Sequence, residues 1–178
     1  MLKKWRKFKG WAVLEYFLKN PNTKLHIRGL SRDINVGPLT AQRYLQLYRD
    51  EGMLNEEKVA NSLQYSLDNT SPVVKSLKRF YFLELLGKIE EVPEGVVSIA
   101  LFGAHASGEY TENSDIDILV IAQDKPNLSI FKKLEKKLAK TVDITTMRLG
   151  EWRALVKKRD EFADSILRNH ILIHGAQL

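Results

Sequence analysis

Two aspartates stand two residues apart where an apolar run begins. Asp115 and Asp117 open the segment DIDILVIA, which ends at Ala122. Side chains two apart in a strand point to the same face, roughly 6.6–6.8 Å apart along the chain. Two carboxylates so placed repel each other, and burying either without a partner is costly. The spacing therefore indicates a site for a divalent cation, and hard oxygen ligands suit Mg²⁺ or Mn²⁺ better than zinc.

A third acid lies further along the chain. Asp143 is flanked by apolar Val142 and Ile144 in the segment TVDIT. An isolated Asp fits poorly in mid-strand or in a core. If this strand lies beside the Asp117 strand, the three carboxylates can hold two metal ions about 3.5–4 Å apart, which suits phosphoryl transfer. The alternative is a pair of strand-end aspartates with Asp143 in a turn, which leaves the preceding glycine turn unexplained.

That glycine turn precedes the two aspartates. Gly103 and Gly108 bracket it, directly after an apolar segment that ends at Phe102. Glycines allow close backbone approach, and a strand that leads through them presents backbone N–H groups, which suit phosphate oxygens. A triphosphate bridged by metal ions would then lie between the turn and the acids.

The stretch LFGAHASGEYTENSDIDILV resembles the signature of the polymerase β-like nucleotidyltransferase superfamily, in its small single-core branch, the minimal nucleotidyltransferases. The shared pattern is a hydrophobic-Gly turn, a second Gly, Asp-hydrophobic-Asp on the next strand and a later third acid. The resemblance covers about Val96 to Gly175. It implies that Asp115, Asp117 and Asp143 are the catalytic metal ligands, with Asp143 also helping to activate the acceptor hydroxyl. The residues that it implies for binding nucleotide phosphates are Gly103, Ala104, Ser107 and Gly108.

One position departs from the family pattern. The family has Ser directly after the first Gly, and this chain has Ala104. A neutral hydrogen bond contributes roughly 0.5–1.5 kcal/mol, and more with a charged partner. We therefore expect nucleotide binding to be weakened without being abolished. Ser107, one helical turn on, is the candidate replacement, and His105 stands where relatives often have a basic residue.

The elements that must position these residues alternate along the second half of the chain. Alternating helices and strands of this kind predict an α/β unit with a small mixed sheet. The predicted strands are Val96–Phe102, Asp115–Ala122, TVDITTM and the edge segment HILIHG, and the predicted helices are Leu128–Lys140 and Glu151–Arg168.

The first part of the chain predicts a different unit. Apolar spacing predicts helices over Leu2–Leu18 and Ile27–Ile34, then a third from Pro38 that ends at Gly52. A hairpin of Leu54–Val59 with the segment LQYSLD follows. This is the order of a winged helix-turn-helix, in which the third helix reads duplex DNA. Its outward side chains, the predicted DNA-binding residues, are Thr40, Gln42, Arg43 and Gln46. The alternative is a three-helix packing module that binds no DNA and serves as a dimer or partner platform.

The predicted fold class is α/β (α+β), with three parts along the chain. They are a winged helix-turn-helix at residues 1–70, a connecting helix at 71–92 and a nucleotidyltransferase core at 93–178. The formal net charge is +6, and residues 1–70 carry 12 of the 28 Lys and Arg but 7 of the 22 Asp and Glu. A basic small domain favours a polyanionic partner. The chain has no cysteine, which excludes disulfides and Cys-based zinc sites. No segment is apolar enough to span a membrane, so we expect a cytoplasmic protein with no membrane partner.

Three functions are predicted. In the first, the chain is an enzyme that uses Mg²⁺ or Mn²⁺ to transfer a nucleoside monophosphate from an NTP, with ATP expected, to a hydroxyl acceptor. In the second, it is a DNA-binding regulator whose core only senses nucleotide, because Ala104 has degraded the site. The third follows from the resemblance alone: an antitoxin-type nucleotidyltransferase that modifies a partner toxin. The sequence is also compatible with a homodimer.

Overall fold

The computed structural model describes residues 7–87 and 92–178, so the predicted helical residues Leu2–Arg6 and the end of the connecting helix at 88–91 lie outside it. The chain forms two compact units. Unit 1 comprises residues 1–81 and 110–112, and unit 2 comprises residues 82–109 and 113–178. The helix α4 (Pro72–Leu86) contributes residues to both. Across the described residues, every helix is too short or too polar to traverse a bilayer.

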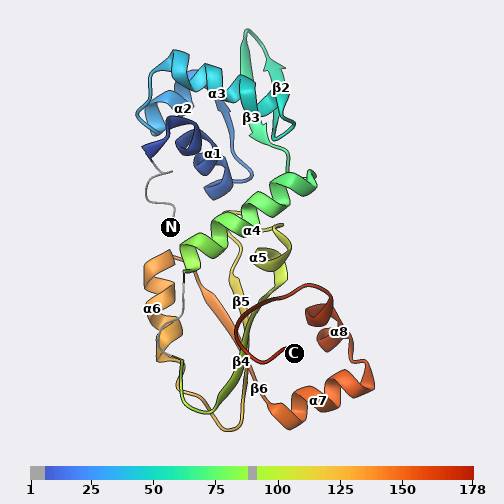
Figure 1. The fold of residues 1–178 in the computed structure, drawn as a ribbon. Coiled ribbons are helices and arrows are strands. Elements are labelled where there is room, and N and C mark those ends of the chain that lie inside the picture. The colour runs from blue at the N-terminus through green and yellow to red at the C-terminus, as the bar shows by residue number, and fades with distance from the viewer. Residues whose placement is uncertain (1–6, 88–91) are drawn as a thin grey trace. The chain divides into compact units, whose positions relative to one another are not determined.

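Unit 1 contains the helices and the hairpin predicted for the first part of the chain, and its mixed helix and strand content agrees with the prediction (Figure 1). Its helices are α1 (Lys9–Lys19), α2 (Ile27–Asp33) and α3 (Pro38–Asp50). Pro38 occupies the first turn of α3, where its missing N–H costs no hydrogen bond. The helices bury a common core whose fully enclosed members include Phe17, Leu30, Leu45 and Tyr65. Whether this unit is a DNA-binding winged helix stays a prediction.

A small antiparallel sheet completes unit 1. The strands β2 (Leu54–Val59) and β3 (Ser62–Leu67) form the predicted hairpin. The strand β1 (Lys24–His26) pairs with the other edge of β3, so that β3 is the central strand. The sequence did not predict β1, because three residues are too few to show a period of two. The sheet order is β1-β3-β2.

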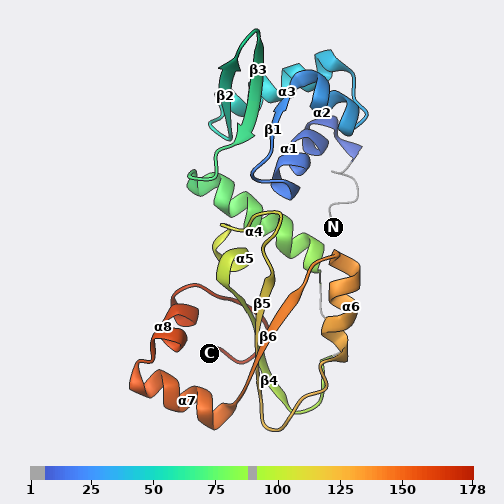
Figure 2. The same ribbon diagram turned by 180° about the vertical axis from the view of Figure 1, so that it is seen from behind.

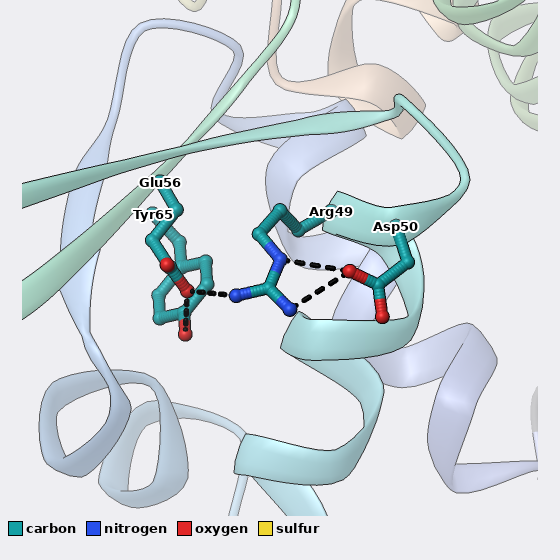
Figure 3. Close-up of polar contacts among 4 residues, drawn as sticks. All are labelled: Arg49, Asp50, Glu56 and Tyr65. Atoms are coloured by element: carbon teal, nitrogen blue, oxygen red, sulfur yellow. Dashed lines mark hydrogen bonds and ion pairs between the residues drawn. The ribbon is translucent and has the colours of Figure 1, made fainter.

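Four polar side chains join α3 to the hairpin (Figure 3). The Glu56 carboxylate of β2 accepts a hydrogen bond from the Tyr65 hydroxyl at 2.5 Å and one from Arg49 Nη1 of α3 at 2.8 Å. Arg49 also donates to Asp50 through Nε, at 2.9 Å. The hydrogen bond from Tyr65, and then Arg49, lowers the pKa of Glu56, and burial first of all raises the pKa of Tyr65 to about 12. The network fixes the hairpin against α3.

Unit 2 is built on a four-stranded sheet in the order β6-β5-β4-β7. Only β5 and β6 run parallel, and β4 pairs antiparallel with both β5 and β7, so the sheet is mixed as predicted. The strands are β4 (Val96–Phe102), β5 (Ile116–Ala122), β6 (Val142–Arg148) and β7 (Ile171–Gly175). The central strand β5 is buried along most of its length, which fits its continuous apolar run.

Helices cover unit 2 on two sides, with α6 on one side of the sheet and α7 and α8 on the other (Figure 2). They are α5 (Gly103–Ser107), α6 (Ser129–Leu138), α7 (Leu149–Lys158) and α8 (Glu161–Arg168). Leu119 and Ile121 of β5 form a core with Trp152 of α7 and with two residues of α8, Ala163 and Ile166. Residues at odd positions of β5 therefore face α7 and α8.

The prediction of one long helix over Glu151–Arg168 was wrong. The chain breaks after α7 at Arg159, which has a left-handed backbone (φ 53°, ψ 47°). Asp160 then caps α8, since its carboxylate accepts hydrogen bonds from the backbone N–H groups of Phe162 and Ala163. An Asp at this position is a common helix start, and its capping bonds favour two short helices over one.

Candidate active site

Strand register brings two of the predicted acids side by side. In the parallel pair β5–β6, Asp117 is the Cα partner of Asp143. Asp115 lies one residue before β5 begins at Ile116. The third strand therefore does lie beside the second, which excludes the alternative that places Asp143 in a turn. All three acids lie at the end of the sheet where β5 and β6 start.

The three carboxylates differ in exposure. Asp115 and Asp143 are exposed, and Asp117 is half-buried. The pKa of Asp117 is raised above its ordinary value, first by burial and then by the negative charges of Asp143 and Asp115. The protonated form of Asp117 is therefore favoured relative to a solvated aspartate, because its two acidic neighbours leave the negative charge unbalanced.

Gly103 lies against Asp117. Its backbone is left-handed, with φ +65°, and a Cβ built on it would overlap the Asp117 carboxylate. Phe102, the preceding residue, is the cross-strand partner of Asp117. The absence of a side chain at residue 103 therefore lets the turn approach this carboxylate, in a conformation that other residues adopt only with strain.

The rest of the predicted phosphate-binding turn forms the short helix α5. The Ser107 hydroxyl donates to the Ala104 carbonyl at 3.1 Å, so it bonds the backbone of its own helix. Gly108 ends the helix with a left-handed backbone, and its N–H donates to the same carbonyl. The geometry gives no support to the hypothesis that Ser107 replaces the family's serine. His105 is fully buried, with its ring centroid 4.3 Å from that of Phe82, so it is not an exposed residue facing phosphate.

The donor set at this edge fits a divalent cation in its chemistry. Three carboxylates supply hard oxygen ligands, and a cation would balance the charge that raises the pKa of Asp117. Within residues 7–87 and 92–178, no three acidic or histidine side chains are already gathered closely enough to enclose an ion. The carboxylates share an edge without converging on one point, as expected for like charges that repel.

Two further residues support this edge and were not predicted from the sequence. Lys140 donates from Nζ to the Ser114 carbonyl at 3.2 Å, directly before Asp115 in the chain. The Glu135 carboxylate accepts the Val142 N–H at 3.1 Å, directly before Asp143. The only available signal was a Lys three residues before the third acid, and a surface lysine is too common to identify a role from sequence.

The predicted DNA-binding residues lie along α3 in unit 1. Arg43 is exposed, and Thr40, Gln42 and Gln46 are half-buried. Leu39, at the start of the helix, is 81% exposed. The Arg43 guanidinium lies 5.9 Å from the ring centroid of Tyr44. The helix α3 therefore has an accessible surface. This is compatible with the predicted role of the four residues and does not test it.

Part of the chain is similar in sequence to known proteins. Residues 83–173 match the family described as the nucleotidyltransferase domain. Two curated relatives, both from Methanocaldococcus jannaschii and named as candidate protein adenylyltransferases, are 46% identical over 59 residues and 47% identical over 49 residues. These matches cover 30% and 28% of this chain and 59% and 50% of the relatives, so the chain spans little more than half the length of the relatives it matches.

Two solved structures resemble part of the chain. One is a mutant of the MntA–HpeT toxin–antitoxin complex, with 21% identity, a TM-score of 0.38 and coverage of 56% of this chain and 74% of that one. The other is a tri-AMPylated HEPN toxin of Shewanella oneidensis with its MNT antitoxin, with 19% identity, a TM-score of 0.33 and coverage of 58% and 74%. Because the family match alone spans residues 83–173, just over half of the chain, the chain belongs to the nucleotidyltransferase domain family.

Proposed function

We propose that this chain transfers an adenylyl group from ATP to a hydroxyl group of a protein acceptor. The observation that carries the proposal is the register of β5 and β6, which pairs Asp117 with Asp143 while Gly103 lies against Asp117. Acids on adjacent strands beside a close-approaching glycine turn are what a metal-bound triphosphate requires. The names of the relatives, protein adenylyltransferases, favour a protein as the acceptor.

The proposed reaction balances without a further reactant. The acceptor hydroxyl oxygen attacks the α-phosphorus of ATP, the bond from that phosphorus to the bridging oxygen of the β-phosphate breaks, and pyrophosphate leaves. The Asp143 carboxylate, which is exposed, would accept the hydroxyl proton, and Asp115 and Asp117 would join it in holding Mg²⁺ or Mn²⁺. When bound, the cation supplies charge neutralisation at the phosphates. Gly103 lets the backbone approach them.

Ala104 affects the strength of this site. The hydroxyl of Ser107 is bonded to the Ala104 carbonyl, so it does not supply the hydrogen bond that the family's serine would give. We expect weaker nucleotide binding than in a relative that has this serine, by about ten-fold for each 1.4 kcal/mol lost. The substitution Ala104→Ser should therefore lower the KM for ATP.

Labelled ATP provides the direct test. The full chain is incubated with α-labelled ATP, Mn²⁺ and candidate acceptor proteins, including the products of neighbouring genes, and label on protein is measured. Asp115→Asn with Asp117→Asn should abolish labelling, whereas Asp124→Asn, in the exposed segment after β5, should not. Undiminished labelling by the double variant would refute the proposal. Label on a toxin encoded next to this gene would identify the antitoxin-type form of the same activity.

The exposed surface of α3 favours a second candidate function, duplex DNA binding by unit 1. Arg43 is exposed, and Gln42 and Gln46 lie on the same helix with donors able to reach base edges. Binding to a pool of duplexes should weaken steeply with salt, and Arg43→Ala should reduce affinity. Lys132→Ala on α6 in unit 2 is a control for nonspecific charge. Equal affinities for the Arg43 variant and the wild type would show that α3 does not bind the duplex.

A further inference from the structure

An exposed aromatic ring lies near the carboxylate edge of unit 2 and has no part in the reaction described so far. Phe162, in the first turn of α8, is 36% exposed. Its ring centroid lies 5.9 Å from that of Phe102, with the planes at 86°, an edge-to-face contact. The exposed part of this ring is available to contact a ligand.

Strand register relates this ring to the site. Phe102 is the Cα partner of Asp117, and such partners in an antiparallel pair are about 4.5–5.5 Å apart with side chains on the same face. Phe102 packs against the core that β5 forms with α7 and α8. Phe162 therefore lies one ring beyond the strand position opposite Asp117, on the face of the sheet toward which Asp117 points.

The ring is held on a rigid element. Asp160 caps α8 by accepting the Phe162 N–H at 3.0 Å, and the Ser165 hydroxyl donates to the Phe162 carbonyl at 2.8 Å. Ala163 and Ile166 of the same helix are buried in the unit 2 core, which anchors α8 to the sheet. The backbone of Phe162 is thus fixed before any ligand arrives, which lowers the entropic cost of binding to its ring.

Charge indicates which part of a nucleotide this ring would meet. Glu161 precedes Phe162 and Asp164 follows two residues later, both in the first turn of α8. Two acids repel phosphate groups, so the triphosphate belongs with the metal ions at the other acids. A neutral base has a flat apolar face that stacks on an aromatic ring, and such stacking tolerates any base.

We propose that Phe162 is the stacking platform for the nucleobase of the bound NTP, with Phe102 supporting its ring from behind. The proposal rests on the proposed function, because it assumes that the triphosphate binds at Gly103 and the three aspartates. It predicts that the ring contributes to the affinity for a whole nucleotide and contributes nothing to the affinity for the triphosphate part alone.

The test compares two probes by calorimetry in the presence of Mn²⁺: a non-hydrolysable ATP analogue and inorganic tripolyphosphate. Phe162→Leu keeps an apolar side chain and removes the aromatic face. It should weaken binding of the analogue about ten-fold and leave tripolyphosphate binding unchanged, while Phe162→Tyr should bind both as the wild type does. Phe80→Leu, which changes another exposed phenylalanine (45%), is the matched control and should change neither.

Each other outcome has a definite meaning. Unchanged affinity of Phe162→Leu for the ATP analogue would overturn the platform. An equal loss for both probes, with a lowered melting temperature, would also overturn it, since the ring would then only support the fold. If the wild type binds tripolyphosphate but gains nothing from the base, the platform alone fails. If the wild type binds neither probe, the proposed function itself fails.

Discussion

The carboxylate of Asp117 fills the space that a side chain at Gly103 would need. The two residues come from different elements, since Gly103 begins α5 and Asp117 lies within β5. Their contact brings the glycine turn directly against one of the three acids. The identity of residue 103 therefore limits where the Asp117 carboxylate, a proposed metal ligand, can lie.

Gly103→Ala tests this contact. Alanine at φ +65° costs about 1–2 kcal/mol of strain, and its Cβ would displace the Asp117 carboxylate. We expect the melting temperature to fall by about 2–4 °C for each kcal/mol and adenylyl transfer to fall at least ten-fold. Gly150→Ala is the control, because nothing lies within 4 Å of its added Cβ. A Gly103 variant with wild-type activity would show that Asp117 is not held by this contact.

Asp117→Asn should stabilise the protein in the absence of metal. A carboxyl with a raised pKa contributes stability below its ordinary value of 3.8 and loses it as the pH rises through the raised value. The ionised Asp117 therefore opposes folding at neutral pH, and neutral Asn removes this effect. We expect a higher melting temperature at pH 7.5, with the difference from wild type vanishing as the pH falls toward 3.8.

Added Mn²⁺ should make the wild type the more stable of the two proteins. The ion binds the folded wild type, which has the Asp117 carboxylate, and should stabilise the Asn variant less. Thermal melts of both proteins, with and without Mn²⁺, measure the effect. If the variant is less stable than the wild type at pH 7.5 without metal, then the ionised Asp117 does not oppose folding.

Glu56→Gln should destabilise unit 1. The Glu56 carboxylate holds both Tyr65 and Arg49, and losing these charged bonds should cost about 1–2 kcal/mol of unfolding free energy at pH 7. Because the pKa of Glu56 is lowered, its contribution is present above the ordinary value of 4.5 and is lost at more acidic pH.

Glu57→Gln, next to it on β2, is the matched control. Glu57 pairs with Lys24 at 3.2 Å with both side chains about 60% exposed, so its loss should cost at most about 0.5 kcal/mol. Denaturant unfolding of the two variants measures the difference. Equal losses would show that the Arg49 network adds nothing beyond a surface ion pair.

Lys140→Met tests the support behind Asp115. The Lys140 ammonium fixes the carbonyl of Ser114, and removing a partner behind a metal ligand typically lowers metal affinity about 10-fold or more. Mn²⁺ titration with a bound ATP analogue measures this affinity, with the exposed Lys136→Met as the control. Identical Mn²⁺ affinities for the two variants would remove Lys140 from the site.

Much of the fold was predictable because its elements carry strong local patterns. The apolar run of β5 and Pro38 in the first turn of α3 are such cases, and the structure has both where the sequence predicted them. The break at Arg159 was missed because the apolar spacing continues through it, and the left-handed residue there is not a glycine. The strand β1 was missed because its only signal is its pairing with β3.

The candidate site divides in the same way. The sequence indicated that Asp143 joins the other two acids only if its strand lies beside that of Asp117, and the register of β5 and β6 meets this condition. The bond from Lys140 to Ser114 and the ring contact of Phe162 could not be predicted, because both depend on how the chain returns after a crossover. Sequence spacing encodes contacts along one strand or helix, whereas these contacts join separate elements.

The single parallel pair in the sheet of unit 2 also has a consequence for folding kinetics. Asp117 and Asp143 become neighbours only after β6 has closed the crossover through α6, a contact between residues distant in the chain. Such non-local contacts form late, because the chain loses loop-closure entropy before the contacts contribute any favourable free energy. We therefore expect bound Mn²⁺ to slow unfolding of this unit while leaving its refolding rate almost unchanged. The rate at which the unit releases bound Mn²⁺ would then measure the lifetime of the native state and not the rate of folding.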